Sequence, residues 1–183
     1  MKNWRGVKWE TALVGLGSNV GDRLVNIASA VRLLGKITGI RPGRVSRVWR
    51  SAPAGYRAQR WFYNAAMRIQ TNLSAKALVT GLTSAERTMG RQKRFRNGPR
   101  EIDIDLLLLG AKKSRSASAT VPHPRMHLRR FVLAPASEVA PAMVHPVLGK
   151  SIRALFRGLH NGGAANVLKP SDQARFRSLV AGR

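Results

Sequence analysis

The sequence predicts an α+β sandwich built around a largely antiparallel sheet. First, the chain has 183 residues of which 44% are hydrophobic, enough for one domain with a real core. Second, apolar runs of strand length alternate with segments whose apolar residues recur at helical spacing, and no internal repeat is present. Mixed strand and helix order of this kind is typical of α+β proteins.

The first third of the chain predicts a strand, a helix and a second strand. Residues 12–17 (ALVGLG) indicate a short buried strand that ends in glycine-rich turn chemistry. Asp22 is a predicted N-cap, Gly35 a predicted helix end, and the helix between them has apolar residues at Leu24, Ile27, Ala28, Val31 and Leu34. The segment RPG at 41–43 predicts a turn, and residues 44–50 predict a strand with an arginine-rich exposed face, followed by a loop over 51–60.

The middle of the chain predicts two strands that flank a helix and a basic loop. In the strand over 61–71, the alternation places Tyr63, Ala65, Met67 and Ile69 on a core face, and Phe62, Asn64, Arg68 and Gln70 on the other. A helix is expected from Ser74 to about Met89. Residues 91–100 form a basic loop interrupted by glycine and proline, and residues 101–109 form the next strand.

The last third predicts shorter elements. Residues 111–120 predict a polar loop, and VPHP at 121–124 predicts a rigid extended turn. Short helices are expected over 129–139 and 151–158. The sequence NGG at 161–163 marks a boundary, after which residues 164–183 are basic and weakly patterned and are expected to be a loosely held tail.

Composition narrows the classes of function. The chain carries 33 Lys and Arg against 8 Asp and Glu, a net charge of +25, which favours polyanions such as nucleic acid, anionic lipid or phosphate-rich substrates. The alternative is a basic surface that affects solubility only. The absence of cysteine excludes disulfides, zinc–thiolate sites and cysteine nucleophiles. No apolar run approaches the ~20 residues of a membrane span, and no apolar stretch at the N-terminus resembles a secretory signal, so we expect a cytoplasmic protein without membrane contact.

Three of the eight acidic residues lie within five positions of each other, in GPREIDIDLLLLG at 98–110. A strand repeats every two residues, so Asp103 and Asp105 point to one face while Ile102 and Ile104 point to the other. Neighbouring carboxylates raise each other's pKa, and a divalent cation removes that cost. Mg²⁺ prefers such hard oxygen ligands together with substrate phosphate. The simpler alternative is a solvated strand face with two surface aspartates.

The basic loop directly before this strand favours the metal interpretation. It reads GRQKRFRNGPR over 90–100 and contains Arg91, Lys93, Arg94, Arg96 and Arg100. In this interpretation the carboxylates hold a metal, the metal binds phosphate oxygens, and the arginines bind the remaining oxygens. The combination makes phosphoryl-type transfer plausible. Alone, such a basic run is more often a solvated loop or a nucleic-acid contact than a catalytic clamp. No P-loop motif is present.

Several motifs in order carry a specific resemblance: GLGSNVGDR, then SAPAG with FYNAA, then NGPREIDIDLLLLG, then VPHP and RRFVLAP. Together they resemble the 6-hydroxymethyl-7,8-dihydropterin pyrophosphokinase family of folate biosynthesis, from about residue 11 to 157. The resemblance implies a ferredoxin-like α/β sandwich with helices on its faces. It also implies an N-terminal extension over 1–10, a pyrophosphokinase domain over 11–160 and a basic C-terminal tail over 161–183.

The resemblance further implies a reaction, in which ATP as co-substrate gives pyrophosphate to the pterin hydroxymethyl oxygen and leaves AMP. Asp103 and Asp105 would bind two Mg²⁺ ions, and Arg91 and Arg100 would stabilise charge on the transferring group. The further residues that the resemblance assigns to ATP are Glu86, Lys93, Leu106, Thr120, His123 and Arg129.

The resemblance also implies a pterin pocket. A flat heterocycle requires aromatic plates and amide donors and acceptors. Phe62 and Phe131 would stack on its two sides, Asn64 would bind the ring edge, and Ser51, Pro53 and Ala54 would complete the pocket. We expect a monomer, with nonspecific polyanion binding through its basic surface. Two alternatives stay open: a nucleic-acid-binding module, and a related transferase that acts on a modified pterin.

Overall fold

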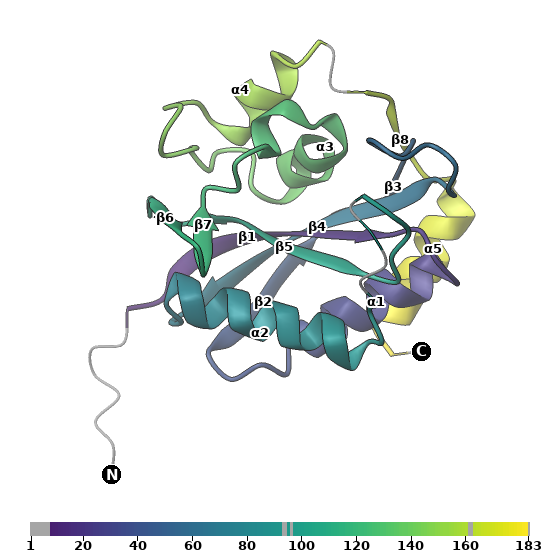
Figure 1. The fold of residues 1–183 in the computed structure, drawn as a ribbon, viewed down its shortest axis with the longest axis horizontal. Helices are drawn as coiled ribbons and strands as arrows, with labels where there is room; N and C mark the ends of the chain where they lie inside the picture. The colour runs from purple at the N-terminus through teal and green to yellow at the C-terminus, as the bar shows by residue number, and fades with distance from the viewer. Residues whose placement is uncertain (1–7, 93–94, 96, 161–162, 183) are drawn as a thin grey trace.

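A six-stranded antiparallel sheet forms the centre of the computed structural model, which describes residues 8–92, 95, 97–160 and 163–182. The strands lie in the order β5-β1-β4-β3-β8, and β2 also pairs with β4. Their bounds are β1 Glu10–Ser18, β2 Ile40–Val45, β3 Trp49–Ser51, β4 Phe62–Thr71, β5 Asp103–Leu109 and β8 Ala165–Val167. Figure 1 shows helices on both faces of this sheet.

The central elements have the expected ferredoxin-like arrangement. The chain runs β1, α1 (Arg23–Leu34), β2, β4, α2 (Ala75–Thr88) and β5, and the outer strands β5 and β2 flank the central pair β1–β4. As predicted, Asp22 caps α1, because its Oδ1 accepts hydrogen bonds from the backbone N–H groups of Leu24 and Val25 at 3.2 Å. Ser74 caps α2 in the same way through the N–H of Ala77.

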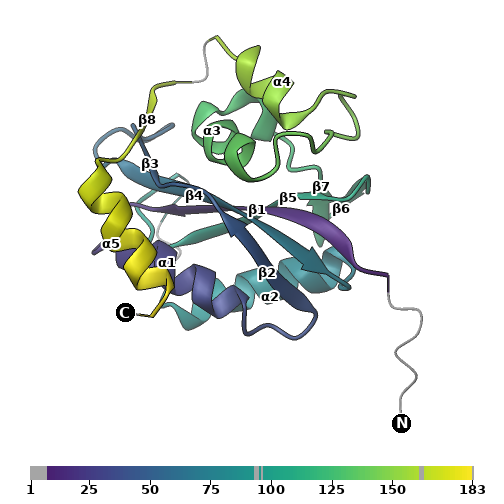
Figure 2. The ribbon, with the colours of Figure 1, turned by 180° about the vertical axis from the view of Figure 1, so that it is seen from behind.

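The sheet separates two apolar cores. The larger core lies against α1, α2 and α5 (Pro170–Val180), and β4 contributes Ala65, Met67 and Ile69 to it, as the alternation predicted. The smaller core lies on the other face, under α3 (Arg130–Val139) and α4 (Ile152–Arg157), and contains Leu13, Ala66 and Leu107. Figure 2 shows the two helical layers from behind.

The region around 41–50 differs from the prediction of a turn at 41–43 and one strand over 44–50. Pro42 and Gly43 belong to β2, whose register with β4 shifts between Pro42 and Val45, and a separate short strand β3 follows. The bulge depends on glycine, because a Cβ on Gly43 would approach the carbonyl oxygen of Arg68 to 2.4 Å. The sequence pattern does not show such a backbone contact.

The predicted polar loop over 111–120 contains a small hairpin. Its strands are β6 (Ser114–Ser116) and β7 (Ala119–Val121). The hydroxyls of Ser114 and Ser116 both donate to the carbonyl of Ala119, at 2.8 and 3.2 Å. The one-turn helix η1 (Met126–Leu128) follows before α3. The hairpin therefore depends on serine side chains that the composition alone assigned to a loop.

The expectation of a loosely held C-terminal tail is wrong. Strand β8 pairs with β3, and α5 packs beside α1. Phe176 is 3% exposed and Leu168 is 7% exposed, and both belong to the larger core. The pattern is weak because α5 buries only a narrow stripe and carries Arg175 and Arg177 on its outer side.

Across the described residues, no helix is both long and apolar enough to cross a membrane.

Candidate active site

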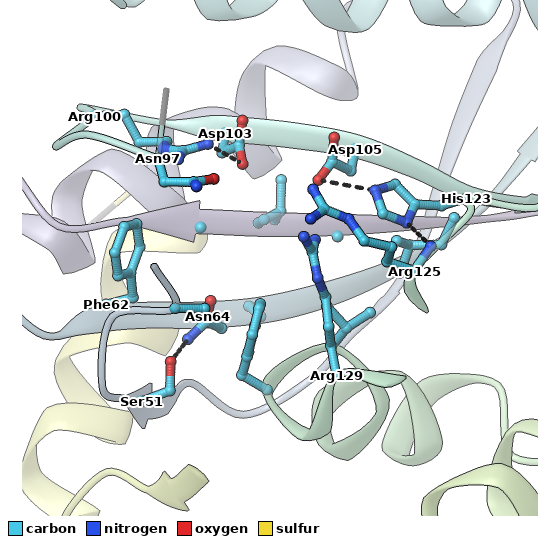
Figure 3. Close-up of a pocket in the computed structure, with 18 of the residues that line it drawn as sticks. Ser51, Phe62, Asn64, Asn97, Arg100, Asp103, Asp105, His123, Arg125 and Arg129 are labelled. Atoms are coloured by element: carbon cyan, nitrogen blue, oxygen red, sulfur yellow. Dashed lines mark hydrogen bonds and ion pairs between the residues drawn. The ribbon is translucent and has the colours of Figure 1, made fainter. Parts of the chain in front are cut away.

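A pocket of about 340 Å³ opens on the sheet face that carries α3, beyond the edge of the smaller core (Figure 3). Its floor comes from β1, β4 and β5, and its walls come from Arg91, Asn97 and Arg100 on one side and from the segment 123–132 on the other. Gly15 and Gly17 of β1 leave this floor open. A Cβ on Gly17 would lie 3.5 Å from Asn64 Oδ1 and 3.8 Å from Asp103 Cβ, and would fill the space between them.

The two predicted aspartates share this pocket, and their surroundings differ. Both line it, as the strand alternation predicted, while Ile104 lies in the larger core on the other face. Asp103 is paired with two arginines, because Arg100 Nη1 and Arg91 Nη2 each lie 2.8 Å from one of its carboxylate oxygens. Among the described residues, no arginine lies within ion-pair distance of Asp105. The strand therefore presents one carboxylate in close ion pairs and one that only more distant arginines, Arg129 and Arg91, partly compensate.

Asp105 has a strongly raised pKa. Burial in the pocket is the main cause, and the charges of Asp103 and Glu86 add to it, so the pKa of Asp105 rises to about 7. The side chain is nevertheless 45% exposed towards the open pocket, which is where a ligand would approach. A bound cation would favour its charged form and reverse the shift.

His123 faces Asp105 as a neutral ring. Burial, together with the charges of Arg129 and Arg125, lowers the pKa of His123 to about 4. Its Nδ1 accepts a hydrogen bond from the backbone N–H of Arg125 at 3.2 Å, which assigns the ring proton to Nε2. Nε2 lies 4.0 Å from Asp105 Oδ2 and faces the pocket (Figure 3). The imidazole therefore presents an N–H donor to an anionic ligand.

Glu86 supports the site from behind. It is 6% exposed on α2, accepts the backbone N–H of Ile104 at 2.6 Å, and pairs with Arg91. Burial raises the pKa of Glu86, while Arg91 opposes the shift. Arg91 is itself partly buried, which disfavours its charge, but Asp103 and Glu86 hold its pKa above the ordinary value. Glu86 thus orients Arg91 and β5 and does not line the pocket.

The other half of the pocket is aromatic and amide-lined. Phe62 and Asn64 follow each other on the pocket face of β4, and Asn64 Nδ2 donates to Ser51 Oγ at 3.0 Å. Phe131 reaches the pocket from α3, and Ala54 lines it from the loop after β3. The predicted pterin-site residues therefore converge, except Pro53, which does not line the pocket.

Asn19 connects the two halves, and the sequence prediction did not identify it. It is 2% exposed, and its Oδ1 accepts the backbone N–H of Arg100 at 2.8 Å. Its Nδ2 donates to Gln59 Oε1 at 2.8 Å, and Gln59 Nε2 donates to the carbonyl of Asn97 at 2.9 Å. These bonds join the turn after β1, the loop 52–61 and the basic loop. The motif GSN marked a turn, but its partners lie 40 and 81 residues away.

The remaining predicted residues lie in several places. Arg129 lines the pocket, and so does Arg125, which the sequence prediction did not include although it directly follows the P-H-P turn. The side chain of Leu106 lies in the larger core on the opposite face from Asp105. Thr120 lines a second cavity, of about 820 Å³, which shares His123 with the first. Lys93 lies outside the described residues.

The site combines a paired carboxylate–arginine cluster with an aromatic and amide pocket in one cavity. Hard oxygen ligands beside guanidinium groups suit a divalent cation with a phosphate chain, and the flat apolar part suits a heterocycle. Fold and site together fit one class of protein, a phosphoryl-transfer enzyme with an aromatic acceptor.

Comparisons with known proteins identify the family. The model of the 7,8-dihydro-6-hydroxymethylpterin-pyrophosphokinase family matches residues 13–141. A 2-amino-4-hydroxy-6-hydroxymethyldihydropteridine pyrophosphokinase of Aquifex aeolicus is 36% identical over 78% of this chain and 88% of its own length. The Bacillus subtilis protein of the same name is 38% identical over 70% of this chain and 77% of its own. The chain therefore belongs to the 7,8-dihydro-6-hydroxymethylpterin-pyrophosphokinase family.

Longer proteins contain the same unit. A folic acid synthesis protein of Pneumocystis carinii is 36% identical over 85% of this chain, which spans about a fifth (21%) of that protein. The solved structure of the Plasmodium falciparum HPPK-DHPS protein with STZ-DHP superposes with a TM-score of 0.63 over 84% of this chain and 44% of that one. Its sequence identity of 16% supports the fold alone.

Proposed function

We propose that the protein transfers a diphosphate group from ATP to the hydroxymethyl oxygen of 6-hydroxymethyl-7,8-dihydropterin, a step of folate synthesis. The oxygen bonds to the β-phosphorus, the bond from that phosphorus to the oxygen bridging to the α-phosphate breaks, and the hydroxyl proton is lost. AMP and the pterin diphosphate leave. The observation that carries the proposal is the meeting of Asp103, Asp105, Arg100 and the Phe62–Asn64 pair in one pocket.

In this proposal the pterin occupies the aromatic half of the pocket. Phe62 and Phe131 contact the faces of the ring, and Asn64, held by Ser51, hydrogen-bonds its edge. Ala54 bounds the pocket from the loop after β3, and the predicted role of Pro53 is not part of the proposal. This arrangement points the hydroxymethyl group towards β5 and its two aspartates.

The phosphate chain of ATP occupies the basic half. Arg91, Arg100 and Arg129 face the phosphate oxygens, and the neutral His123 donates from Nε2. The arginines that now neutralise Asp103 would transfer part of their interaction to charge that develops on the transferring group. We place the nucleoside end beyond His123, towards Thr120 of the second cavity.

The carboxylates fit divalent cations. Asp103 and Asp105 lie on one strand face, and burial and the neighbouring carboxylates raise the pKa of Asp105. We propose that they hold two Mg²⁺ ions, which when bound neutralise phosphate charge. A monomeric state, a cytoplasmic location and nonspecific polyanion binding stay predictions.

A direct assay tests the proposal. Purified protein is mixed with ATP, MgCl₂ and the hydroxymethyldihydropterin, and AMP is measured over time. AMP should form only with the pterin present, and Asp103→Ala or Asp105→Ala should reduce the rate by about two orders of magnitude or more. Glu10→Ala, which removes a carboxylate that pairs with Lys112 at the start of β1 outside the pocket, is the matched control and should keep the rate. Near-normal turnover in either pocket variant would contradict the assignment.

A further inference from the structure

Strand β3 brings Ser51 to the pocket, and it is held from both sides. It has only three residues, Trp49–Ser51, and pairs with β4 on one side and with β8 on the other. Without β8 it would be a very short edge strand with one row of backbone groups unpaired. The second neighbour comes from residues 165–167, more than 110 positions along the chain.

A glutamine of α5 holds the residue just before β3. Gln173 is 6% exposed, its Oε1 accepts the backbone N–H of Val48 at 3.0 Å, and its Nε2 donates to the carbonyl of Val48 at 2.8 Å. The carbonyl of Val48 also accepts the N–H of Leu168 at 3.0 Å. The side-chain amide therefore pairs with Val48 as a neighbouring strand would, and satisfies both of its buried backbone groups.

This contact lies on a short path to the candidate pterin site. Val48 precedes β3, and Ser51 ends it. Ser51 is 3% exposed, accepts from Asn64 at 3.0 Å, and lies opposite Phe62 in the β3–β4 register. The loop 52–61, which carries Ala54 and Gln59, begins at the next residue. A displacement of β3 would move all these groups together.

We propose that the C-terminal segment, residues 165–180, is a positioning element for the pterin half of the pocket, and that Gln173 is its principal positioning residue. The inference rests on the proposed function for its ligand. The phosphate half should be affected less, because Asp103 and Asp105 lie on β5, at the far side of β1 and β4 from β3, and the loop 52–61 reaches the segment that carries Arg100 through the bonds of Gln59 and Asn19. The segment should therefore affect pterin affinity more than ATP affinity.

Two substitutions in α5 separate positioning from stability. Gln173→Met keeps the side-chain volume and removes both hydrogen bonds to Val48. Phe176→Leu is the matched control, since it lowers stability by loosening the larger core from the same helix and leaves Val48 bonded. Unfolding midpoints are measured first, so that both variants are compared at a temperature where both are folded.

Ligand binding and hydrogen exchange then test the proposal. Calorimetric titration with hydroxymethyldihydropterin should show about threefold to tenfold weaker binding for Gln173→Met, with little change for Phe176→Leu. The affinity for a non-hydrolysable ATP analogue with Mg²⁺ should be similar in all three proteins. Exchange of the backbone amides over 48–51 should be faster in Gln173→Met than in Phe176→Leu at matched global stability.

The outcomes that would contradict the positioning role differ from those that would contradict the proposed function. Unchanged pterin affinity in Gln173→Met, or an equal loss in both variants, would overturn the positioning role. If the wild-type protein binds the ATP analogue but no pterin, the proposed function is wrong. The exchange measurement needs no ligand, and equal exchange over 48–51 in the two variants would overturn the inference whatever the substrate is.

Discussion

Asp105 is the pocket carboxylate that has no arginine at ion-pair distance among the described residues, and this has a consequence for stability. A carboxyl group with a folded-state pKa of about 7 binds a proton more readily in the folded state than in the unfolded chain, where its pKa is near 3.8. Its contribution to folding stability is fully present below pH 4 and is lost as the pH rises towards and through 7. In the absence of nucleotide and metal, this carboxylate therefore lowers the free energy of unfolding at neutral pH.

We predict that Asp105→Asn removes this dependence. In metal-free buffer, the difference between the unfolding midpoints of the variant and the wild type should grow in favour of the variant from pH 5 to pH 8. Glu86, whose pKa is also raised by burial, remains in both proteins, and the loss of its repulsion with Asp105 changes stability in the same direction. Urea unfolding at each pH measures the difference. A constant difference across this range would show that Asp105 titrates normally.

Side-chain contacts connect the two loops that border the pocket. Asn19 and Gln59 join the loop 52–61 to the basic loop, and an edge-to-face contact of Tyr56 with Phe95, at 5.1 Å between ring centroids, adds a second link. Order imposed on the first loop by a bound heterocycle should therefore extend to the segment that carries Arg100.

We predict that Gln59→Ala uncouples these loops. In the wild type, pterin binding should slow hydrogen exchange over 97–100, and in the variant that protection should be lost while the global unfolding midpoint changes little. Gln70→Ala is the matched control, since Gln70 is exposed on β4 and its side-chain Nε2 donates to Thr11 Oγ1, outside the pocket. Equal protection in the wild type and Gln59→Ala would exclude this path.

These contacts also mark what the sequence could and could not predict. Local patterns were sufficient for the Asp22 cap, the core face of β4 and the shared face of Asp103 and Asp105, because each depends on residues a few positions apart. The hydrogen bonds from Gln173 to Val48 and from Asn19 to Gln59 connect positions 125 and 40 residues apart. Residue types alone do not specify such partners, so the ordered C-terminal segment and the link between loops were missed.

At the scale of the whole molecule, the chain has a net charge of +25, and some of its arginines lie over aromatic rings outside the pocket. Arg50 lies over Trp61 at 4.6 Å and Arg23 over Tyr63 at 3.8 Å, while Arg60 donates to the carbonyl of Gly21 at 3.3 Å. Burial, and then the charges of Arg60 and Arg50, lower the pKa of Arg23, so the three cations are close neighbours. The carboxylate of Asp22 is already paired with Arg175.

We predict that this cluster of Arg23, Arg50 and Arg60 is the preferred contact of the basic surface for phosphate chains. A single-stranded oligonucleotide should bind weakly, and three phosphate contacts imply a loss of about tenfold to twentyfold in affinity between 50 and 200 mM salt. The double variant Arg50→Gln/Arg60→Gln should weaken binding and flatten this salt dependence, whereas Asp103→Asn should not weaken binding.

The control Arg153→Gln/Arg157→Gln removes the same charge from the exposed surface of α4. Fluorescence anisotropy at several salt concentrations measures all of them. If the α4 variant loses as much affinity as the cluster variant, the charge acts as a diffuse field and the arginine–aromatic contacts have no special role.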